Sequence, residues 1–122
     1  MTDQEMMAAI LDSFKDPVLF TDTDHIVRYM NKVAMSFYKE GKDLIGKSLF
    51  NCHNAESQRE IIDILAAMRA GKVEEQLITD SEEKRAYMRA VRDQKGQVIG
   101  YYERYELPGN QPPLTFPANG CG

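Results

Sequence analysis

The sequence predicts an α+β fold in which an antiparallel sheet carries helices on one face. Two short strand patterns separated by a tight turn lie near the N-terminus, at 17–22 and 26–30. Helical patterns then occupy most of 32–70, and three strand patterns follow one another between 73 and 106. Strands joined by such short turns pair antiparallel, so this order indicates one sheet with the helices gathered on one side.

Composition and charge limit the classes of function. The chain has 122 residues, of which 43% are hydrophobic and 28% are charged, and its net charge is −4. This length suits one domain. The densest group of basic residues, within 84–92, is flanked by acidic ones, which argues against nucleic-acid binding. No apolar stretch approaches the ~20 residues of a membrane span, and the acidic N-terminus lacks a signal-peptide pattern, so we expect a cytoplasmic protein with no membrane contact.

An amphipathic helix is expected at residues 3–14 and ends before Pro17, because the residue preceding a proline is disfavoured in helical conformation. Its apolar face either covers the open sheet face of its own domain or mediates dimerisation, and the two roles are compatible. The residues of this face are Met6, Met7, Ile10, Leu11 and Phe14.

The middle of the chain predicts short irregular helices followed by one long helix. Gly41 and Gly46 interrupt the apolar pattern after Asn31, whereas Asn54 is placed to cap a helix over 55–70 that Gly71 ends. The expected apolar face of that helix comprises Ile61, Ile62, Leu65 and Met68.

The last third predicts strands at 73–79, 85–92 and 98–106. Alternation places Ala86, Met88 and Ala90 on one face of the second of these strands. We assign Tyr102 to the same helix-covered face, although the reverse register, with Tyr101 and Tyr105 inside, fits the pattern as well. From Leu107 the chain is rich in proline and glycine, which predicts a domain at 1–106, with an N-terminal cap helix, and an extended tail at 107–122.

Four segments in this order resemble the PAS family of sensor domains: 16–22, 26–31, 44–47 and 87–101. The resemblance covers about residues 5–106. It implies a five-stranded antiparallel sheet in the order 2-1-5-4-3, with helices on one face around a pocket. The segment 49–54, with Cys52 and His53 just before the long helix, is similar to a bacterial subgroup of PAS domains that carry a Cys-His pair there.

The resemblance implies a sensory function through ligand or cofactor binding. Many PAS domains end their last strand in an Asp-Ile-Thr-like motif that couples to an effector, whereas this chain has Glu106-Leu107-Pro108. No effector domain follows in this sequence. We therefore expect the output to act in trans, through dimerisation or a separate partner, unless the chain is a piece of a longer protein.

The expected ligand pocket lies between the sheet and the long helix. If the ligand is haem, His53 is the candidate iron ligand and Cys52 a candidate second ligand, although many haem-binding PAS domains draw their histidine from the long helix, which has none here. The alternatives are that His53 caps the helix or bonds backbone carbonyls, and that Cys52 is a small buried hydrophobe. The expected lining, with His53 at its edge, is Ile61, Ile62, Leu65, Met88 and Tyr102.

Two further polar residues are expected to be structural. Asn31 is expected to tie the following loop to the backbone, and His25, in the first hairpin turn, to face solvent. The second hypothesis for function is a ligand-free module for protein interaction or dimerisation. The sequence has no nucleophile–base pair, glycine-rich phosphate loop or metal-ligand spacing, so we do not expect an enzyme.

Overall fold

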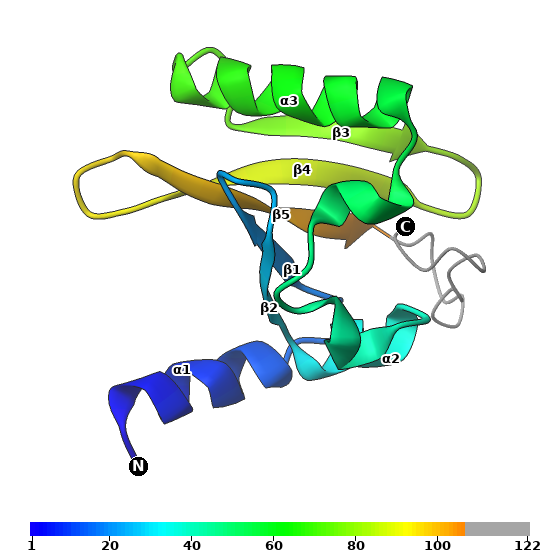
Figure 1. Ribbon diagram of the computed structural model, residues 1–122. Coiled ribbons are helices and arrows are strands. Elements are labelled where there is room, and N and C mark those ends of the chain that lie inside the picture. The colour runs from blue at the N-terminus through cyan, green and yellow to red at the C-terminus, as the bar shows by residue number, and fades with distance from the viewer. Residues whose placement is uncertain (107–122) are drawn as a thin grey trace.

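The computed structural model describes residues 1–106 as an antiparallel five-stranded sheet in the order β2-β1-β5-β4-β3, with helices on one face (Figure 1). The fold class and strand order expected from the sequence are confirmed, whereas the tail at 107–122 lies outside the described residues. The strands are β1 (Leu19–Asp22), β2 (Val27–Met30), β3 (Glu75–Asp80), β4 (Arg85–Arg92) and β5 (Val98–Glu106). The helices are α1 (Asp3–Asp12), α2 (Lys32–Phe37), α3 (Ala55–Arg69) and the 3₁₀ helices η1 (Gly41–Leu44) and η2 (Leu49–Cys52).

The register of β4 and β5 decides which aromatic side chains enter the core. Met88 is paired with Glu103, and the next pair is Arg89 with Tyr102. Residues directly opposite each other in an antiparallel pair share a face, so Tyr102 lies on the outer face with Arg89. The placement of Tyr102 beside Met88 is therefore wrong. The reverse register holds, and Tyr101 and Tyr105 are the buried residues.

Helix α3 packs against the sheet with a slightly different face from the expected one. Ile61, Ile64, Leu65 and Met68 are buried, whereas Ile62 is 48% exposed. Successive helical residues are about 100° apart, so a face centred on Ile61, Leu65 and Met68 includes Ile64 and leaves Ile62 beside it. The expected N-cap is confirmed, because Asn54 Oδ1 accepts a hydrogen bond from Ser57 N–H at 2.9 Å.

Asn31 joins four parts of the chain at the end of β2. It is fully buried, and its Oδ1 accepts from Val18 N–H at 2.9 Å and from Ala34 N–H at 3.0 Å. Its Nδ2 donates to the carbonyl oxygens of Leu11 at 2.9 Å and Asp16 at 3.1 Å. The side chain thus caps α2 and fixes the end of α1 against β1, which confirms its expected structural role.

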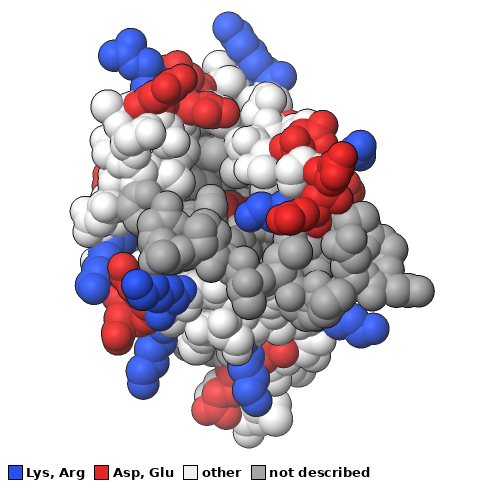
Figure 2. All heavy atoms as spheres, turned by 90° about the vertical axis from the view of Figure 1, so that its right-hand side faces the viewer, with Lys and Arg blue, Asp and Glu red and all other residues white. Residues whose placement is uncertain are grey.

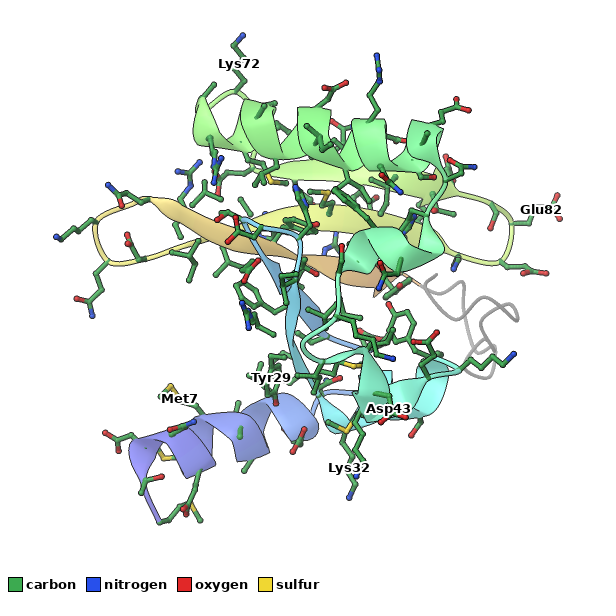
Figure 3. The ribbon with its side chains drawn as sticks, in the orientation of Figure 1. Met7, Tyr29, Lys32, Asp43, Lys72 and Glu82 are labelled. Atoms are coloured by element: carbon green, nitrogen blue, oxygen red, sulfur yellow. The ribbon has the colours of Figure 1, made fainter. Side chains whose placement is uncertain are left out.

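Helix α1 projects from the rest of the fold and does not cover the sheet (Figure 1). None of its residues is buried, although a complete capping box between Thr2 and Glu5 fixes its first turn. Met7, for example, lies on α1 well away from the sheet (Figure 3). The expectation that this helix covers its own sheet face is therefore wrong.

No helix within 1–106 combines the length and the apolar character needed to cross a bilayer.

Candidate ligand site

Polar side chains enter an otherwise apolar interior between the sheet and the helices. β1 contributes Thr21, which is fully buried, and β5 contributes Glu103, which is 8% exposed. Around them lie the apolar side chains of the core, including Met88 and Leu65. A buried polar group is costly unless it forms hydrogen bonds, so the partners of each group indicate what the interior is built to hold.

One polar cluster joins β5 to the C-terminal end of α2. Tyr105 Oη donates to Glu103 Oε2 at 2.5 Å and Tyr38 Oη donates to the same oxygen at 3.1 Å, with the two hydroxyls 2.7 Å apart. Burial, and then the charge of Glu103, raises the pKa of both tyrosines well above the ordinary value. Both phenols therefore keep their protons, and the cluster offers one carboxylate already bonded by two donors. Lys84 Nζ lies 5.4 Å from the centre of the Tyr105 ring, within reach of a cation–π contact.

A second polar group centres on His25. We expected this residue to face solvent, but it is partly buried. His25 Nδ1 lies 2.8 Å from Tyr101 Oη, and its ring stacks on Phe50 with centroids 4.3 Å apart. The residue has a φ of 64°, a left-handed conformation that histidine tolerates better than most residues. The imidazole is directed toward Tyr101 of β5, and the residue is partly buried. Burial lowers the pKa of His25 below its ordinary value, so the ring is neutral at pH 7.

Two buried polar atoms have no hydrogen-bond partner within the described part of the chain: Thr21 Oγ1 and His53 Nε2. The Thr21 hydroxyl lies near the Tyr101 phenol without a hydrogen bond of normal geometry. His53 follows η2, and its carbonyl accepts from Gln58 Nε2 at 2.8 Å, while the α3 cap is Asn54. His53 therefore does not cap α3 with its side chain, and its Nε2 donates to no described carbonyl.

The expected lining residues are only partly brought together. Ile61, Leu65 and Met88 belong to one buried cluster, whereas Ile62 and Tyr102 lie outside it. The side chain of Cys52 is not among those that the structure describes. Sequence reasoning missed the interior polar residues. The sequence does contain the alternating pattern Tyr101-x-Glu103-x-Tyr105, which places the three residues on one face of β5. Only the register of β5 shows that this face is the buried one.

Among the hollows of this fold are two whose linings consist of described residues other than His53. One, of about 500 Å³, lies between α3 and the start of β3 and includes Ile64, Val73 and Gln76. The other, of about 470 Å³, lies between α3 and the β1–β2 turn and includes His25 and Arg69. The unpartnered Nε2 of His53 is chemically suited to binding haem iron, and His53 lines neither of these two hollows.

Comparison with solved structures finds the same fold in several bacterial proteins. A C-terminal domain from Streptococcus mutans matches with a TM-score of 0.70 and 22% identity, covering 87% of this chain and 85% of that one. The PAS domain of Bordetella pertussis BvgS matches with a TM-score of 0.62 and 16% identity, covering 90% of each chain. The Aer2 receptor from Vibrio cholerae, described as a dual PAS-haem oxygen sensor, matches with a TM-score of 0.55 and 14% identity, covering 78% of this chain and 96% of that one.

Comparison with curated proteins finds no significant match. The family comparison is decisive, because the family model described as the PAS fold matches residues 11–106. That range includes all five strands and every helix that packs on the sheet. The chain belongs to the PAS family.

Proposed function

We propose that this chain is a non-catalytic sensory module that binds a small ligand between the sheet and α3 and passes the signal to another polypeptide in trans. PAS domains are sensor and signalling modules, and this chain has the family's fold over residues 11–106. The proposal adds a ligand to that general role. It rests on the two buried polar atoms that lack hydrogen-bond partners, Thr21 Oγ1 and His53 Nε2.

Each of these atoms lowers the stability of the ligand-free protein, because a buried polar group without a partner loses its hydrogen bonds to water and gains none. A ligand that bonds them recovers this loss. Thr21 lies on β1, opposite Tyr101 of β5, and His53 lies between η2 and α3. A bound molecule would therefore contact the central strands and the connection into α3. Binding of the ligand would then shift the protein toward the conformation that binds it better.

The test is native mass spectrometry of the purified protein, comparing the folded protein with the denatured chain. We expect an added mass on the folded form that is lost on denaturation. Thr21→Val keeps the shape of the side chain and removes the unpartnered hydroxyl, so it is expected to reduce retention of the ligand roughly tenfold and to leave the empty fold intact. Thr79→Val, on the edge strand β3, is the matched control and is expected to retain the ligand.

An unmodified mass for the wild-type protein, expressed in several hosts and growth media, contradicts the ligand proposal. Haem is distinguished in the same preparations by absorbance after expression with haem supplementation. An intense Soret band that His53→Ala abolishes identifies haem as the ligand. A retained mass without a Soret band identifies another small molecule.

A specific observation favours a second candidate function, dimerisation through α1. Four large apolar side chains on or just after this helix are between 46% and 55% exposed: Met6, Met7, Ile10 and Phe14. An isolated helix of 10 residues is marginally stable in water, so α1 gains from packing on another surface. The proposed occupant is α1 of a second copy of this chain, because the same apolar face is then buried on both copies.

Sedimentation equilibrium tests this candidate with two variants of equal charge. Ile10→Glu places a carboxylate on the apolar face and is expected to weaken the dimer at least tenfold, whereas Ala9→Glu changes an exposed position beside that face and is expected to leave association within about twofold. A monomeric wild-type protein, or equal weakening by both substitutions, rejects dimerisation through α1.

A further inference from the structure

We propose that the hollow between α3 and the β1–β2 turn is a second binding site, separate from the interior, and that it takes a small molecule with an apolar body and one carboxylate. Its volume of about 470 Å³ is in the range of small-molecule sites. Side chains of two kinds meet there: hydrogen-bond donors at one side and an apolar floor at the other. The lining is Thr23, His25, Ile62, Leu65, Ala66, Arg69 and Ala70.

The polar side chains of this hollow are able to donate hydrogen bonds to one anion. His25 uses Nδ1 to contact Tyr101, which leaves Nε2 without a hydrogen bond to any described residue. Thr23 contributes a hydroxyl from the turn, and Arg69 contributes a guanidinium from the last turn of α3. A guanidinium with a neighbouring N–H or O–H donor matches the two oxygens of a carboxylate.

Arg69 is available for such a ligand. Its guanidinium forms no ion pair or hydrogen bond with any residue in 1–106, whereas the arginines that do form ion pairs are Arg28, Arg85, Arg89, Arg92 and Arg104. No aspartate or glutamate lines this hollow. The other described hollow differs, because it places Arg59 among Glu56, Glu60 and Asp63. In an acidic protein, the hollow at Arg69 is thus lined by one cation and neutral groups.

The carboxylate of Asp22, beside the turn, already has hydrogen-bond partners. Asp22 Oδ1 accepts the N–H groups of Asp24 and Ile26, at 2.9 Å and 3.0 Å, and its Oδ2 accepts from Arg28 Nε at 2.7 Å. Asp24 is exposed and is not part of the lining. The carboxylates closest in sequence to His25 therefore do not occupy the position proposed for the ligand anion.

The turn holds His25 rigidly in an unfavourable conformation, as is common at binding sites. Its φ of 64° lies in the left-handed region, which is unfavourable for a residue with a side chain. The Phe50 stack, the Tyr101 contact and the hydrogen bond from Leu49 N–H to the His25 carbonyl at 2.7 Å together fix the residue. A donor fixed before binding loses little freedom when a ligand arrives.

The apolar floor of this hollow includes Ile62, and a ligand bound there would account for the exposure of this side chain. Ile62 is 48% exposed on a helix whose other large apolar side chains are buried, and it lies in this hollow beside Leu65 and Ala66. A ligand whose carboxylate meets Arg69 is able to cover Ile62 with its apolar part. This favours aliphatic or aromatic monocarboxylates over phosphate or sulfate, which have no apolar part to cover the floor.

The experiment is a titration of the ¹⁵N-labelled full chain with sodium benzoate, followed by ¹H–¹⁵N correlation spectra. We expect saturable shifts of the amide signals of Thr23, His25, Ala66 and Ala70, and no such shifts with benzamide, which has the same ring and no charge. Inorganic phosphate is expected to bind at least tenfold more weakly than benzoate.

Two variants test the assigned residues, and a third is the control. Arg69→Gln is expected to weaken benzoate binding about tenfold. His25→Asn keeps a residue that tolerates the left-handed conformation and removes the imidazole, and it is expected to weaken binding several-fold. Arg59→Gln removes an equal charge from the same helix at the other hollow and is expected to leave the affinity within about twofold.

Shifts that rise linearly without saturation, equal binding of benzamide, or equal losses in Arg69→Gln and Arg59→Gln each reject the proposed site. This test is independent of the interior ligand. The amide shifts of Thr23, His25, Ala66 and Ala70 report on this hollow, whereas the retained mass reports on the interior ligand, so failure at one site is distinguishable from failure at the other.

Discussion

Replacing Gly100 by alanine is expected to destabilise the domain by at least about 3 kcal/mol, near the upper end of overpacking effects. Gly100 lies in β5, the central strand, where it pairs with Asp22 of β1 and Val91 of β4. A Cβ at this position would lie 2.2 Å from the carbonyl oxygen of Thr21 and 2.6 Å from Cζ of Phe20. A side chain such as Phe20 is able to rotate away, but the Thr21 carbonyl belongs to the backbone of the neighbouring strand. The methyl group therefore forces β1 and β5 apart.

Urea denaturation followed by circular dichroism measures this loss. Gly96→Ala is the matched control, because Gly96 has a φ of 82° and open space where the added methyl group would lie, so only the left-handed backbone is penalised. We expect that control to lose about 1 kcal/mol. A loss for Gly100→Ala no larger than that of Gly96→Ala means that β1 and β5 do not approach each other as closely as the structure indicates.

Replacing Asn31 by alanine is expected to cost about 3 kcal/mol or more of unfolding free energy. The substitution removes four hydrogen bonds at a fully buried position, each worth about 1 kcal/mol, and leaves buried partners unpaired. Two of those partners, the carbonyls of Leu11 and Asp16, belong to the connection between α1 and β1. We therefore also expect faster amide hydrogen exchange in α1, which has no buried residue of its own.

Asn54→Ala is the control for the capping part of this effect. Asn54 also caps a helix, but it is exposed and its side chain accepts one hydrogen bond, from Ser57 N–H. Its loss is expected to be about 1 kcal/mol. Equal losses for the two substitutions, again measured in urea, would show that Asn31 acts only as a helix cap and does not join α1 to the sheet.

Acidic and basic side chains are intermingled among the described residues of the face shown in Figure 2. Several charged side chains of the sheet pair across strands, as Arg104 does with Glu75, with Nε 2.9 Å from Oε1. Arg92 pairs in the same way with Glu74, before β3. This agrees with the interpretation of the basic residues of β4 as a solvated strand face.

Local signals were sufficient to predict the elements and their order. The cap at Asn54 and the break before Pro17 each act on neighbouring residues, so the sequence displays them directly. Alternation in β4 likewise identified Ala86, Met88 and Ala90 as one buried face. The candidate site was less predictable: Ile61, Leu65 and Met88 were placed in the core, whereas Ile62 and Tyr102 were not found there.

By itself, then, the sequence determined an antiparallel sheet with helices on one face, because periodicity and capping are properties of consecutive residues, whereas the PAS strand order was implied by the resemblance. Only the tertiary structure decided that Tyr101 enters the core and Tyr102 does not, since a one-residue change of register exchanges the two faces of a strand. The tertiary structure also turned His25 inward, through contacts with Phe50 and Tyr101 that lie far away along the chain. Such contacts depend on where distant strands and helices meet, which no local pattern records.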